Sequence, residues 1–164
     1  MEKEAGRAAP ATTVAERRAW TWPEKALLVA LALGILHHID HVLRVDHSGW
    51  PFRPNVTPFT YSLLVYPIGL AVLAARSRPW LRVGLVAFLF LAIQAAHTFV
   101  EPPSAQYGVW ARGYSLEPYA LHQPNLLHVH SPTLGVLSAG LAITLSLVLI
   151  AALIGFIGEA RSRI

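Results

Sequence analysis

Four long apolar runs divide the chain, at residues 26–43, 59–75, 80–100 and 133–157. A helix rises about 1.5 Å per residue, so about 20 apolar residues cross the hydrocarbon core of a bilayer. The second run has 17 residues, at the short limit. The pattern predicts an all-α integral membrane protein, with four transmembrane helices in an up-down bundle. The expected helices cover about residues 24–44, 59–76, 79–101 and 132–158.

The segments that connect these runs are short, with one exception. Residues 1–22 carry no apolar periodicity and predict a disordered or interfacial cytoplasmic tail, so residues 23–164 form one domain. Arg82 interrupts the third run near its start, where a long side chain can reach the headgroup layer. The exception is the segment 101–132. Structureless loops beyond about 12–15 residues are uncommon, so we expect a folded cap here, with a short helix around residues 116–122.

Composition supports the membrane assignment. The chain is 54% hydrophobic and 13% charged, whereas soluble domains carry about 25% charged residues. The net charge of +4 does not indicate nucleic acid, because the basic residues follow the membrane topology. There is no cysteine, which excludes thiolate ligands and iron–sulfur clusters.

Basic residues predict the orientation. Ten of the 13 fall at one end of the predicted bundle. They are Lys3, Arg7, Arg17, Arg18, Lys25, Arg76, Arg78, Arg82, Arg161 and Arg163. The positive-inside rule then places both termini in the cytoplasm of a plasma (inner) membrane protein. All eight histidines fall on or near the opposite, extracytoplasmic half.

The first chemical motif is His37-His38-Ile39-Asp40-His41, near the end of the first helix. An ionisable cluster within a membrane segment marks a functional site unless shown otherwise. His37 and His41 are one helical turn apart and can share one metal ion. Asp40 or His38 can reach a second ion or orient a ligand. The simplest structural alternative for Asp40 is an i,i+4 pair with Arg44.

Two further motifs lie at the same end. His97 and Glu101 are one turn apart on the third helix, a common metal-binding pair in helical bundles. His128 and His130 precede the fourth helix, and they face one target if that segment is extended. Ser131 as N-cap, followed by proline in the first turn, predicts the start of that helix.

Weaker candidates complete the set. Asp46 and His47 are interpreted as a hydrated loop pair near the site entrance, and His122 as a surface histidine. Tyr61 and Tyr66 either approach the site or lie at the membrane interface. The predicted metal ligands are His37, His38, His41, His97, Glu101, His128, His130 and Asp40.

These residues favour a membrane metalloprotein that binds one or two transition-metal ions. Imidazole suits iron, copper and zinc. We favour iron or copper in a metalloenzyme of the oxidoreductase or oxygenase type, acting on an apolar or lipid-like substrate. The small size of the chain leads us to expect a homo-oligomer or partner membrane subunits.

Three alternatives remain open. One is a b-type haem electron carrier, with His37 or His41 facing His97. Another is a zinc-dependent membrane hydrolase using a metal-activated water. The third is a metal transporter or a structural subunit of a larger membrane complex. The inner halves of the helices offer little polarity for a transport path beyond Thr144 and Ser146.

Overall fold

The computed structural model describes residues 19–45 and 57–163, and every regular element there is a helix. The elements are α1 (Trp22–Arg44), α2 (Pro58–Ser62), α3 (Val65–Ala74), α4 (Pro79–Phe99), α5 (Pro103–Arg112), the 3₁₀ turn η1 (Pro118–Ala120) and α6 (Pro132–Arg161). Except for α3, each has a proline at its first or second position, where the missing N–H costs no helical hydrogen bond. The predicted start of the last helix is confirmed, because the Ser131 hydroxyl accepts from Leu134 N–H at 3.2 Å.

Three of these helices, α1, α4 and α6, are long and apolar enough to span a membrane, which indicates a membrane protein. They contain 23, 21 and 30 residues. The remaining apolar stretch, Pro58–Ala74, is shorter, and a turn at Leu63 and Leu64 divides it into α2 and α3. The single second helix expected at 59–76 is therefore two shorter helices.

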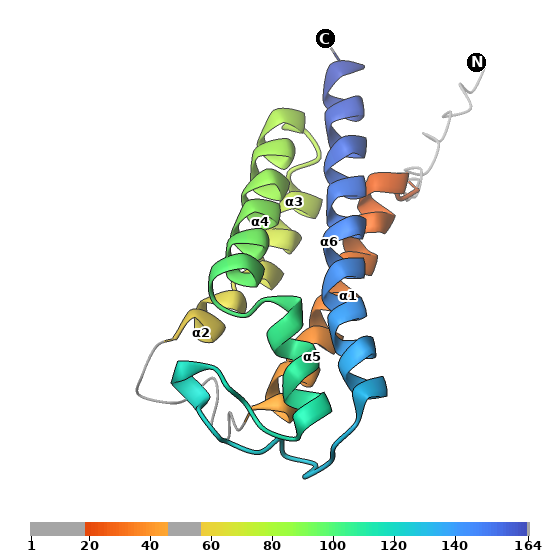
Figure 1. The fold of residues 1–164 in the computed structure, drawn as a ribbon. Helices are drawn as coiled ribbons and strands as arrows, with labels where there is room; N and C mark the ends of the chain where they lie inside the picture. The colour runs from red at the N-terminus through yellow and green to blue at the C-terminus, as the bar shows by residue number, and fades with distance from the viewer. Residues whose placement is uncertain (1–18, 46–56, 164) are drawn as a thin grey trace, which may run out of the picture.

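The long helices lie side by side (Figure 1) and pack around an apolar core. α1, α3, α4 and α6 all contribute fully buried side chains, among them Leu27, Val72, Val86 and Phe156. Around this core, Leu91, Leu147 and Ile154 are each more than 60% exposed. Aliphatic side chains so exposed on candidate membrane spans suit contact with lipid tails.

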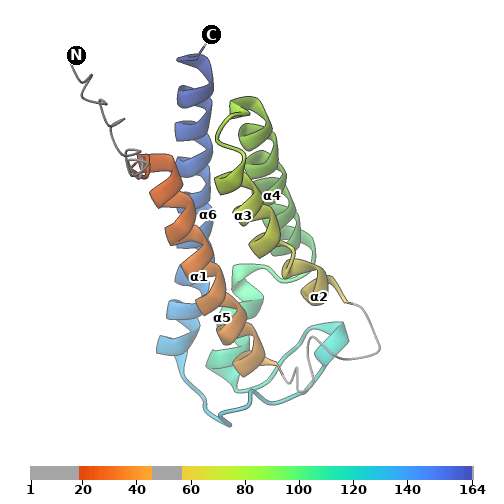
Figure 2. The same ribbon diagram turned by 180° about the vertical axis from the view of Figure 1, so that it is seen from behind.

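The bundle has two distinct ends, as the views in Figures 1 and 2 show from opposite sides. α1 begins, α6 ends and α3 turns into α4 at one end, here called the tail end. α1 and α4 finish and α6 begins at the other, together with α2, α5 and η1. We call this the histidine end, because it carries His37, His41 and His97. α1 and α4 run in the same direction toward it.

The segment between α4 and α6 contains more helix than expected. The ten-residue α5 was not predicted, and the short helix expected at 116–122 is only the turn η1. α5 packs closely on α6: a Cβ added at Gly135 would lie 2.7 Å from the Tyr107 carbonyl oxygen. This close approach explains why a residue without a side chain stands there.

A second polar cluster lies at the tail end. Arg82 donates to Glu24 at 2.7 Å, to Glu159 at 3.2 Å and to the Val72 carbonyl at 3.1 Å. Arg76 adds two bonds to Glu24, both at 2.9 Å. The expectation that Arg82 extends to the headgroups is wrong, because its side chain is 2% exposed and ion-paired. Burial makes such pairing obligatory, since an unpaired charge there costs several kcal/mol.

Candidate metal centre

Two histidines from neighbouring helices meet at the histidine end. His37 on α1 and His97 on α4 have ring centroids 5.0 Å apart, and their Nε2 atoms lie 3.2 Å from each other. His37 is 8% exposed. Its Nδ1 is buried and has no hydrogen-bond partner among the described residues. The pair thus brings two imidazole nitrogens within hydrogen-bonding distance of each other at the histidine end.

One helical turn further on, a second pair repeats this arrangement. His41 Nε2 lies 2.8 Å from Glu101 Oε2, and the His41 ring stacks on Phe59 with centroids 4.1 Å apart. The two pairs align because α1 and α4 are parallel and the paired residues are four apart on each side. His37 and His41 lie on α1, and His97 lies on α4 with Glu101 just after its end. His37 and His41 themselves have ring centroids 6.4 Å apart, so as placed each imidazole is directed to α4 or its end rather than to the other.

Arg44 links the two carboxylates of the site. Its guanidinium binds Glu101 through Nη1 and, at 3.2 Å, through Nη2. Its Nε donates to Asp40 at 2.6 Å, which is the i,i+4 pair given above as the structural alternative to a metal role for this acid. The Arg44 side chain has no solvent exposure. Both acids therefore serve, as placed, as counter-ions of one buried cation.

Further donors hold the carboxylates. Asp40 accepts from Trp110 Nε1 at 2.9 Å and from the Ser138 hydroxyl at 2.7 Å. The Tyr119 hydroxyl donates to Glu101 at 3.4 Å. α1, α4, α5 and α6 are thereby joined through one polar network. Fully satisfied networks of this kind make a buried arrangement rigid.

The protonation state of Glu101 follows from this network. Burial alone would raise the pKa of its carboxyl group. The hydrogen bond from His41 and the charge of Arg44 outweigh that effect and hold the pKa well below its usual range. Glu101 is therefore an anion at neutral pH.

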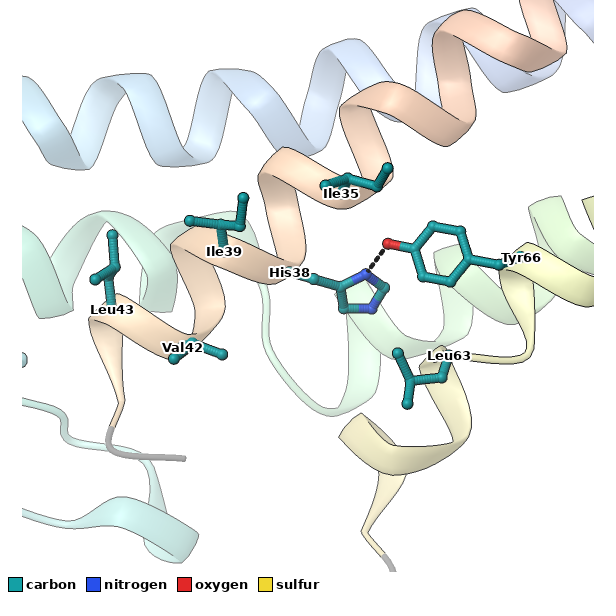
Figure 3. A pocket seen from close by; sticks show the side chains of 7 residues that line it. All are labelled: Ile35, His38, Ile39, Val42, Leu43, Leu63 and Tyr66. Carbon is teal, nitrogen blue, oxygen red and sulfur yellow. Dashed lines mark hydrogen bonds between the residues drawn. The ribbon is translucent and has the colours of Figure 1, made fainter. Parts of the chain in front are cut away.

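His38 points to a different neighbour. Its Nδ1 lies 2.6 Å from the Tyr66 hydroxyl, as the dashed line in Figure 3 marks, and its Nε2 lies 2.7 Å from Ser62 Oγ. The Ser62 hydroxyl in turn reaches the Phe59 carbonyl at 2.6 Å. Tyr66 thus approaches the site, one of the two places expected for it. Tyr61 is 64% exposed.

The remaining predicted ligands lie apart from these pairs. His128 and His130 are exposed, and within residues 19–45 and 57–163 no hydrogen bond or ring contact joins either one to another predicted ligand. The His130 ring lies instead against Gly113. His122 is exposed, and its ring centroid is 6.1 Å from that of Tyr114. Asp46 and His47 lie outside the described residues.

As placed, the described residues contain no group of three or more His, Asp or Glu side chains that could hold one metal ion. The imidazoles come together in a pair, and the carboxylates are directed to Arg44. The metal role of His38, His128, His130, Asp40 and Glu101 stays a prediction.

The sequence interpretation missed several members of the network. Trp110 and Ser138 carry no motif, because a lone indole or hydroxyl in an apolar stretch has no characteristic spacing. The pairing of Glu24 with Arg82 could have been found. Both are charges in predicted membrane segments at the same end, and burial requires such charges to pair.

Comparison with known proteins gives no family for the chain: no protein-family model matches it, and neither the curated proteins nor the solved structures contain a significant match.

Proposed function

We propose that this chain is a membrane metalloprotein that binds one transition-metal ion between His37 and His97. The supporting observation is the 3.2 Å separation of their Nε2 atoms. Two imidazole ligands at about 2.0–2.1 Å from a tetrahedral ion are about 3.3 Å apart. The separation of the two nitrogens is therefore suited to one ion.

Water or substrate completes the coordination in this proposal. His41 lies one helical turn from His37 on the same helix and can become a third protein ligand. It would exchange its bond to Glu101 for a bond to the ion. Catalytic metal sites keep such positions open. Asp40 and Glu101 act by fixing Arg44, and Glu101 also orients His41.

The proposed chemistry is oxidation or oxygen activation with iron or copper, on an apolar substrate that arrives through the bilayer. An all-imidazole donor set suits both metals, and also zinc with a hydrolytic water. In the proposed topology α2 and α3 together form the fourth membrane element. Both termini lie in the cytoplasm of an inner-membrane protein, and the histidine end faces outward. The distribution of basic residues supports this orientation.

The haem alternative uses the same two histidines, since His37 faces His97 across the bundle. These two histidines would hold the iron if a haem entered between their rings. Their Nε2 atoms lie 3.2 Å apart, in direct contact, which favours a single ion over a haem between them. A haem protein would also show a Soret band on purification.

Cobalt titration tests the proposal. Detergent-purified full-length protein is stripped with a chelator, titrated with Co²⁺, and followed by visible absorption, because tetrahedral Co²⁺ absorbs strongly. We expect one ion per chain with tetrahedral bands. His37→Gln and His97→Gln should each weaken binding at least about tenfold, a loss that even outer-shell changes can produce. His122→Gln, in the exposed loop, is the matched control.

Two results would contradict the proposal. Equal Co²⁺ affinity in the wild type, His37→Gln and His97→Gln would mean that the pair is only a hydrogen bond between two imidazoles. A Soret band lost in both variants would replace the ion with haem.

A further inference from the structure

A groove opens beside α1, between that helix and the α2–α3 segment. It has a volume of about 490 Å³ and is lined by Ile35, His38, Ile39, Val42, Leu43, Leu63 and Tyr66. We call it the side groove. Figure 3 shows its aliphatic side chains on α1 and at the turn after α2, with His38 and Tyr66 between them. Its size is typical of sites for small organic ligands, which combine apolar walls with a few polar groups.

The side groove is positioned to take its ligand from the bilayer. Two of its wall residues, Ile35 and Ile39, are each 51% exposed and belong to α1, a candidate membrane span. All walls except the His38–Tyr66 pair are aliphatic. In a membrane, such an opening is in contact with hydrocarbon rather than with water, which selects a molecule with an apolar chain.

The His38–Tyr66 pair determines which polar group the ligand carries. The Ser62 hydroxyl donates to the Phe59 carbonyl, so Ser62 accepts from His38 Nε2–H. Nδ1 of the neutral ring then accepts from Tyr66 O–H. A ligand that enters between Tyr66 and Nδ1 must accept from one and donate to the other. A hydroxyl group does both, and does so for either tautomer of the ring, whereas an ether or ester oxygen only accepts.

We propose that the side groove binds a lipid-like alcohol, with its hydrocarbon chain along the aliphatic walls and its hydroxyl between Tyr66 Oη and His38 Nδ1. The rings of His38 and His37 have centroids 6.4 Å apart, so the side groove borders the helix face next to the candidate metal centre. The role of this alcohol as the substrate rests on the proposed function, whereas its binding in the side groove does not.

Photo-crosslinking tests the binding. Full-length protein in lipid nanodiscs is labelled with a tetradecanol carrying a diazirine in its chain, and the modified residues are mapped by mass spectrometry. Competition with 1-tetradecanol and with its methyl ether compares a hydroxyl group with an ether oxygen on the same chain. We expect labelling within residues 35–43 and 63–66. The alcohol should compete about fivefold better than the ether, the value of about one hydrogen bond.

Three variants sharpen the test. Tyr66→Phe keeps the ring and should weaken competition by the alcohol and by the ether alike, about fivefold, because it removes the hydrogen bond that either ligand oxygen accepts. Leu63→Trp fills the groove and should abolish labelling. The matched control is Tyr61→Phe, which removes the same hydroxyl from an exposed position of α2 and should leave both unchanged.

Equal competition by the ether, unchanged competition by both ligands in Tyr66→Phe, or labelling outside the groove would each overturn the inference. The metal content of each sample separates this outcome from the proposed function. A chain that prefers the alcohol but binds no metal supports the groove and refutes the metal site. A chain that binds metal but does not prefer the alcohol supports the metal site and refutes the groove proposal.

Discussion

Replacing Arg44 with methionine tests the polar network at the histidine end. The change removes the cation that Asp40 and Glu101 share, although the two carboxylates keep their bonds to Trp110, Ser138 and His41. Breaking a buried ion pair on one side costs about 3–5 kcal/mol. Because other donors remain, we expect the lower value, about 3 kcal/mol. For a chain of this size that corresponds to a fall in Tm of about 6–12 °C.

The assay is thermal unfolding in detergent, followed by circular dichroism. Arg78→Met is the matched control, because Arg78 is exposed and forms no ion pair within the described residues. In Arg44→Met/Glu101→Gln one of the uncompensated charges is gone, so the double variant should be more stable than Arg44→Met alone. Equal losses in Arg44→Met and Arg78→Met would refute the reasoning, as would a double variant less stable than the single one.

Two more predictions use neighbouring features. The pKa of Glu101 is lower in the folded chain than the unfolded value of about 4.3. The contribution of this carboxylate to folding stability is therefore complete at neutral pH and is lost as the pH falls below that value. The difference in Tm between wild type and Glu101→Gln should therefore shrink below about pH 4, and a difference independent of pH would contradict this. Gly135→Ala should lower stability by about 1–3 kcal/mol, because the new methyl group meets the Tyr107 carbonyl. Gly140→Ala, which meets open space, should not, and equal effects in the same unfolding assay would contradict the close packing of α5 on α6.

The main helices could be predicted from the sequence because their signals are local. Apolar length predicts α1, α4 and α6, and Ser131 with the following proline predicts where α6 begins. The break at Leu63 and Leu64 could not be predicted, since both residues continue the apolar run. α5 has only ten residues and is far less apolar than the candidate spans. It packs on α6, a contact that no local pattern reveals.

The sequence predicted which residues of the site share a helix face, but not which of them pair between the two helices. The i,i+4 spacing of His37 and His41 indicated one shared ion, and that of His97 and Glu101 a second pair. In the structure the parallel helices pair the stripes in register, His37 with His97 and His41 with Glu101. The direction and depth of two packed helices decide such pairing, and neither is encoded in spacing alone.

The metal content of the protein as purified tests the central claim most directly. Full-length wild type and His37→Gln/His97→Gln are purified in parallel without added metal and without chelator, and are measured by inductively coupled plasma mass spectrometry. We predict about one iron or copper ion per wild-type chain and less than about one tenth of that in the double variant. Equal metal content in the two folded proteins would contradict the assignment of His37 and His97 as ligands.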